Sequence, residues 1–157
     1  MRILKIYDDY LRLHTLGLDR ELQKELPDWR VEYYHVHASR KKIERVFPDN
    51  LETDGLDLNT DDEVLILWNY FWSDCRNGFQ EEVKKKILKL VEQGAKIRMR
   101  LYTSYGTYGE AERELKDYRK YYGSDVVFNN VEVVMHVSTI IPIWAKREAQ
   151  IIRRNYK

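Results

Sequence analysis

The stretch Glu63–Tyr105 decides the fold. It reads EVLILWNYFW (63–72), SDCRNGFQEEVKKKILKLVEQGA (73–95) and KIRMRLYTSY (96–105). The first piece is a short apolar run typical of a buried strand, the second carries apolar residues at helical spacing, and the third alternates apolar and basic residues as a strand does. A strand, a helix and a second strand in about 40 residues predict a parallel β-α-β unit.

Length and composition set the class of protein. The 157 residues predict one domain, with 43% hydrophobic and 34% charged residues as in globular proteins. Cys75 is the single cysteine, so an internal disulfide and a cysteine-based metal site are excluded, and a reducing, cytoplasmic location is favoured. No apolar run is long enough to predict a membrane span.

The flanking segments extend the alternation of strands and helices. Further strands are predicted over residues 2–7, 29–37 and 126–139, helices over 18–26, 40–47, 110–122 and 142–155, and a long acidic loop over 49–62. This order predicts a single three-layer, doubly wound α/β domain over 1–157 that is Rossmann-like or flavodoxin-like. It would have about five mostly parallel strands with helices on both faces.

In such a sheet a ligand binds beyond the carboxyl ends of the strands, where the strand order reverses. The loops expected at that edge start after the strands at 2–7, 63–69 and 96–102. The polar, aromatic and glycine residues of these loops are the predicted ligand contacts: Asp8, Asp9, His14, Gly17, Arg20, Asn69, Tyr70, Trp72, Thr103, Ser104 and Gly106. No metal site is predicted, because the acidic loop lacks the glycine and the final glutamate of a calcium loop.

Two His-x-Ser triplets indicate a second candidate function with different chemistry. His37-Ala38-Ser39 and His136-Val137-Ser138 each lie near the end of a predicted strand. They resemble the paired motifs of the 2H phosphoesterases, which implies one histidine as base and the other as acid. On this alternative, His37 and His136 are the catalytic residues of a phosphoesterase or nuclease. Nucleic acid is then a candidate partner, because basic residues and tyrosines of the second half could contact phosphates.

Three longer segments resemble the N-terminal half of retaining GT-B glycosyltransferases. They are MRILKIYDDYLRLHTLGLDRELQKEL at the start, EVLILWNYFWS in the centre, and VEVVMHVSTIIPIWAKREAQIIRRNYK at the end. The resemblance implies a domain that binds a sugar or nucleotide-linked ligand as part of a glycosyl transfer system, with a nucleotide sugar as its ligand. Arg20 stands at the family's matching place, whereas Leu16-Gly17 replaces the family's pair of glycines.

Other departures keep the alternatives open. The family's histidine after the strand 96–102 is absent, and so is its second, nucleotide-sugar-binding domain. The chain would then act only with a partner subunit or as a homo-oligomer, or it has lost the chemistry. The loop Thr103–Gly109 also resembles the third flavin loop of flavodoxin-like proteins, which makes FMN the second cofactor candidate. A third reading is a non-enzymatic module that binds another protein through its Tyr- and Trp-rich edge.

Overall fold

The computed structural model describes residues 1–8, 11–37, 40–53, 61–69, 79–102, 131–134 and 141–156. Seven strands and four helices lie in these ranges. The strands are β1 (Arg2–Asp8), β2 (Arg30–His37), β3 (Lys42–Phe47), β4 (Leu51–Thr53), β5 (Glu63–Asn69), β6 (Lys96–Tyr102) and β7 (Val131–Val134). The helices are α1 (Arg12–Thr15), α2 (Leu18–Glu25), α3 (Phe79–Glu92) and α6 (Ile141–Asn155).

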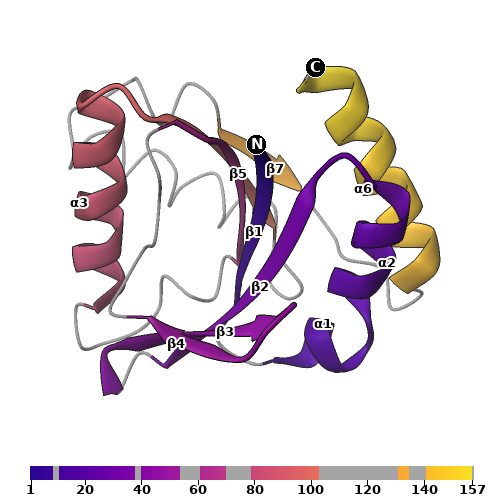
Figure 1. Ribbon diagram of the computed structural model, residues 1–157, viewed down its shortest axis with the longest axis horizontal. Helices are drawn as coiled ribbons and strands as arrows, with labels where there is room; N and C mark the ends of the chain where they lie inside the picture. The colour runs from indigo at the N-terminus through magenta and orange to yellow at the C-terminus, as the bar shows by residue number, and fades with distance from the viewer. Residues whose placement is uncertain are drawn as a thin grey trace.

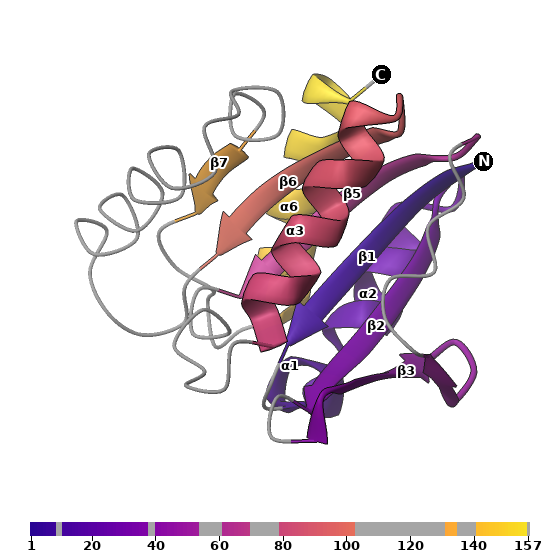
Figure 2. The ribbon, with the colours of Figure 1, turned by 90° about the vertical axis from the view of Figure 1, so that its left-hand side faces the viewer.

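The strands form one sheet in the order β4-β3-β2-β1-β5-β6-β7. Within this order, the five strands β2, β1, β5, β6 and β7 pair parallel with one another. Figure 1 shows α3 on one side of the sheet and α1, α2 and α6 on the other. In Figure 2, α3 lies in front of the parallel strands. The β-α-β unit predicted from Glu63–Tyr105 is confirmed as β5, α3 and β6.

The predicted doubly wound sheet of mostly parallel strands is wrong. The sheet is mixed, because β3 pairs antiparallel with β2 and β4 pairs antiparallel with β3. The segment predicted as a helix over 40–47 is strand β3, and the predicted acidic loop over 49–62 contains β4. Strand and helix therefore do not alternate along the chain between β2 and β5. The helix predicted over 110–122 lies outside the described residues.

A packing demand explains why residues 42–47 form a strand. Ile43 is buried against the α3 side of the sheet, whereas Val46 and Phe47 pack against the core on the other side. A register shift beside Tyr33 and Tyr34 accompanies this change of face. A helix would place all three apolar side chains on one stripe, while a strand with β-branched residues serves both faces.

Two apolar cores lie on the two faces of the sheet. On one face, Leu4, Ile6 and Tyr33 pack with α1, α2 and α6. On the other face, Tyr7 and Tyr34 stack with ring centroids 4.9 Å apart and join the core beneath α3. Because side chains alternate along β1 and β2, each strand contributes to both cores. The two central strands are therefore buried on both sides, which fixes the position of the residues at their ends.

Candidate functional site

Polar side chains gather at the carboxyl ends of β1 and β2, on the face covered by α1 and α2. Asp8 follows Leu4 and Ile6 on this face, and His35 and His37 follow Tyr33. The backbone register places Asp8 opposite His35, and His35 opposite the glutamate of β3. We refer to the set as the edge cluster: Asp8, His14, Asp19, Tyr33, His35, His37 and Glu44.

Asp8 and Tyr33 form the buried part of the edge cluster. Asp8 is only 1% exposed, and the Tyr33 hydroxyl donates a hydrogen bond to its Oδ2 atom. Burial, together with the negative charge of Asp8, raises the pKa of Tyr33 far above its ordinary value. Tyr33 therefore remains a neutral hydrogen-bond donor at any physiological pH, and the Asp8 carboxyl group is held in one position.

His14 and Asp19 form a histidine–carboxylate pair next to this buried group. His14 Nδ1 lies 2.5 Å from Oδ2 of Asp19, and the His14 and Tyr33 ring centroids are 5.4 Å apart. The Asp19 side chain is fully buried, whereas that of His14 is 26% exposed. Because the Asp19 carboxylate can only accept, His14 Nδ1 is the donor in this hydrogen bond. His14 Nε2 has no hydrogen-bond partner among the described residues. This geometry suits a general acid or base.

A tight turn between α1 and α2 positions His14. Gly17 is the residue before α2 and has φ of +87°, where L-residues are strained. Its N–H donates to the His14 carbonyl at 3.0 Å, and Arg20 Nη2 donates to the same oxygen at 3.4 Å. The Arg20 backbone N–H donates to Oδ1 of Asp19 at 3.1 Å. The turn therefore holds the backbone of His14 and the carboxylate of Asp19 together.

A second histidine–carboxylate pair lies further along β2. His37 Nε2 is 3.1 Å from Oε2 of Glu44, and both side chains are partly exposed. The His35 and His37 rings are in contact, with centroids 3.8 Å apart. Two of the three histidines in the edge cluster, His14 and His37, are thus each paired with a carboxylate on one face of the sheet.

Five of the predicted site residues meet at this edge: Asp8, His14, Gly17, Arg20 and His37. The backbone of Asn69 ends β5, the neighbour of β1, and pairs with Tyr102. The remaining predicted residues lie outside the described ranges, namely Asp9, Tyr70, Trp72, Thr103, Ser104, Gly106 and His136.

Sequence reasoning missed four members of the edge cluster. Tyr33 and His35 share the two-residue period of His37 on β2, and this period was the available signal. Asp19 carries no local motif that marks it as the partner of His14. Glu44 was missed because its segment was predicted to be a helix.

Comparisons with known proteins give no relative. No protein-family model, no curated protein and no solved structure matches the chain. Within the described ranges, no three or more His, Cys, Asp or Glu side chains are grouped to hold a metal ion. None of the four described helices has the length and apolar character needed to cross a membrane.

Proposed function

We propose that the chain binds a sugar or nucleotide-linked ligand at the edge cluster, with His14 as its acid–base group. The observation that carries the proposal is the His14–Asp19 pair beside the buried Asp8–Tyr33 pair at the end of β1. The partly exposed carboxylate of Glu44 can accept hydrogen bonds from sugar hydroxyls, and the open Nε2 of His14 can accept a hydroxyl proton. Asp19 would then stabilise the charged imidazole.

The place of the cluster in the sheet also supports this proposal. The chain passes from β1 to β2 on one side and to β5 on the other, so the order of the parallel strands reverses at β1. Ligands of open α/β sheets bind outside the carboxyl ends of strands at such a reversal. A role in glycosyl transfer would further require a second, nucleotide-sugar-binding domain next to this one.

Titration calorimetry with a nucleotide sugar tests the proposal. UDP-glucose, FMN and AMP would be titrated into the wild-type chain and into H14Q, with K24Q on the exposed end of α2 as the matched control. We expect UDP-glucose to bind and H14Q to weaken it about tenfold, the worth of one hydrogen bond to a charged group. The absence of binding by UDP-glucose, or equal affinity in H14Q and K24Q, would contradict the proposal.

The two histidine–carboxylate pairs favour a second candidate, phosphodiester cleavage. One histidine would remove a proton from the nucleophile and the other would protonate the leaving oxygen. His14 and His37 are the described candidates for these roles. His136, which the sequence motif pairs with His37, lies outside the described residues.

A cleavage assay separates this candidate from the first. Bis(p-nitrophenyl) phosphate would be incubated with the wild-type chain, H14A and H37A over a range of pH. An acid–base pair predicts a bell-shaped profile that loses one limb in each variant. Cleavage that is unchanged in both variants removes this second candidate.

A further inference from the structure

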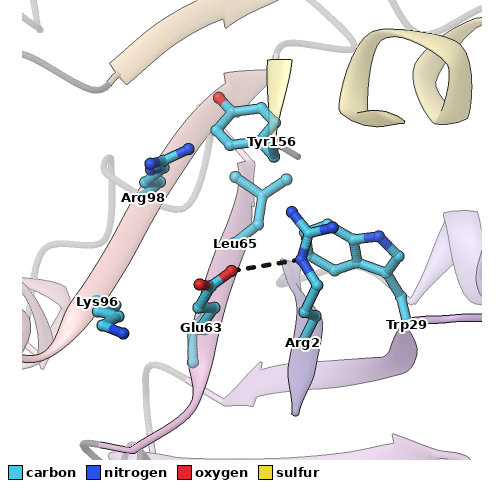
Figure 3. A pocket seen from close by; sticks show the side chains of 8 residues that line it. Arg2, Trp29, Glu63, Leu65, Lys96, Arg98 and Tyr156 are labelled. Atoms are coloured by element: carbon cyan, nitrogen blue, oxygen red, sulfur yellow. Dashed lines mark ion pairs between the residues drawn. The ribbon is translucent and has the colours of Figure 1, made fainter. Parts of the chain in front are cut away.

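A second candidate site lies at the opposite edge of the sheet, where the parallel strands begin. Both chain termini lie at this edge (Figures 1 and 2). A pocket of about 90 Å³ opens there on the α6 side of the sheet. Figure 3 shows Glu63 and Leu65 of β5 in the middle, with Arg2 and Trp29 on one side and Lys96 and Arg98 on the other. Tyr156, which follows α6, completes the lining.

Two arginines of the pocket lie against aromatic rings. The Arg2 guanidinium is 4.3 Å from the centroid of the Trp29 ring, and that of Arg98 is 5.3 Å from the Tyr156 ring. Stacking of this kind holds the flat face of a guanidinium and leaves its N–H edge open for an anion. Each of the two arginines therefore has an aromatic ring beside it at the pocket.

The charges of the pocket are unbalanced. Three cations face one carboxylate, that of Glu63, whose Oε2 lies 3.3 Å from Arg2 Nε. Arg2 Nε is nevertheless buried and makes no hydrogen bond within the described residues. Lys96 and Arg98 form no ion pair with any residue that the structure describes. A concave site with excess positive charge and an apolar floor concentrates anions.

We propose that this pocket binds a phosphate group, carried either by free phosphate or by a phosphorylated small molecule. The volume admits a group of a few heavy atoms, because one water in the liquid occupies roughly 30 Å³. Phosphate oxygens can accept from the guanidinium of Arg98, while Lys96 and Arg2 contribute positive charge. The site is separate from the edge cluster and does not depend on the function proposed for it.

NMR titration at constant ionic strength tests the proposal. The indole N–H signal of Trp29, assigned with W29F, would be followed while inorganic phosphate or glucose 6-phosphate replaces chloride. We expect a saturable shift, with affinity reduced about fivefold in K96M and in R98Q, one screened charge contact each. E63Q removes the competing carboxylate and should strengthen binding. Tighter binding of glucose 6-phosphate identifies a phosphorylated small molecule, and equal or weaker binding identifies free phosphate.

Control variants define the result that overturns the proposal. K85M and K89Q change exposed lysines of α3 on the other face of the sheet and should leave the affinity unchanged. The proposal fails if phosphate gives no saturable shift, or if K85M and K89Q weaken binding as much as K96M and R98Q do. H14Q should retain phosphate binding, so loss of ligand binding at the edge cluster and loss of phosphate binding are distinguishable.

Discussion

At Glu32, three cationic side chains and a phenol converge on one buried carboxylate. Oε1 accepts from the Tyr34 hydroxyl at 2.9 Å and lies 3.3 Å from Lys5 Nζ. Oε2 accepts from Arg30 at 2.8 Å and from Arg45 at 3.1 Å. The carboxylate thus joins β1, β2 and β3 beneath the α3 side of the sheet. The charge of Glu32 is what allows Lys5, only 2% exposed, to remain in the interior.

Removal of this charge should destabilise the protein strongly. We expect E32Q to lower the free energy of unfolding by about 3 kcal/mol or more, because breaking a buried ion pair leaves a buried cation without its counter-charge. Urea denaturation measures the change. The matched control is E21Q, which removes an exposed pair with Lys24 and should cost less than about 1 kcal/mol. Equal losses in the two variants would contradict the role given to Glu32.

Glu32 also predicts the direction of acid sensitivity. Burial alone would raise its pKa, but the hydrogen bond from Arg30, the charge of Lys5 and the hydrogen bonds from Tyr34 and Lys5 lower the pKa below its ordinary value of 4.5. The stabilisation is therefore complete above pH 4.5 and is lost as the pH falls through the lowered pKa. Melting temperatures measured from neutral to acidic pH should fall less steeply in E32Q than in the wild type.

Among the elements, α6 packs closely on α2 because the buried face of α6 carries small side chains. Ala145 and Ala149 are fully buried, between Trp144 and Ile152 on the same face. Spacings of three, four and seven residues along α6 predicted this stripe from the sequence alone. Glu148, also buried in α6, pairs with Arg100 of β6 and ties the helix to the sheet.

Overpacking of this stripe should destabilise the domain. We expect A149L to lower the free energy of unfolding by about 1–3 kcal/mol, because the added methylenes have no space between α2 and α6. K146L places the same leucine side chain at an exposed position of the same helix and is the control. Thermal denaturation of both variants measures the difference. An A149L variant as stable as the wild type would show that α6 does not pack as described.

Sequence patterns predicted elements well where one face or both faces of a segment are uniformly apolar. The runs that became β1, β5, β6, α2, α3 and α6 have this property. Residues 40–53 do not, because Ile43 faces one core and Val46 the other, a pattern that tertiary packing decides. Glu44 was not predicted as a site residue because its segment was predicted to be a helix. Asp8, at the end of β1, and His14 and Gly17, which follow it, could be predicted from their place in the sequence, but their neighbours Asp19 and Tyr33 required the fold.

At the scale of the whole molecule, the two candidate sites occupy opposite ends of the same strand. Arg2 begins β1 at the cationic pocket, and Asp8 ends it in the edge cluster. Six residue steps along a strand span about 20 Å, so one small ligand cannot contact both sites. Variants of one site should therefore act independently of variants of the other. In the double variant of H14Q and R98Q, the loss of UDP-glucose affinity should equal that in H14Q alone. The loss of phosphate affinity should equal that in R98Q alone.

The most direct test of the edge cluster is a titration observed at the histidine side chains. UDP-glucose would be added to uniformly labelled protein, and the imidazole signals of His14 and His37 would be followed together with the indole N–H of Trp29. Binding at the edge cluster predicts saturable shifts of the His14 and His37 imidazole signals, and D19N should abolish the shift of His14, whether or not the Trp29 signal also responds to the phosphates of the ligand. Shifts confined to Trp29, or no shifts at all, would contradict a ligand site at the end of β1.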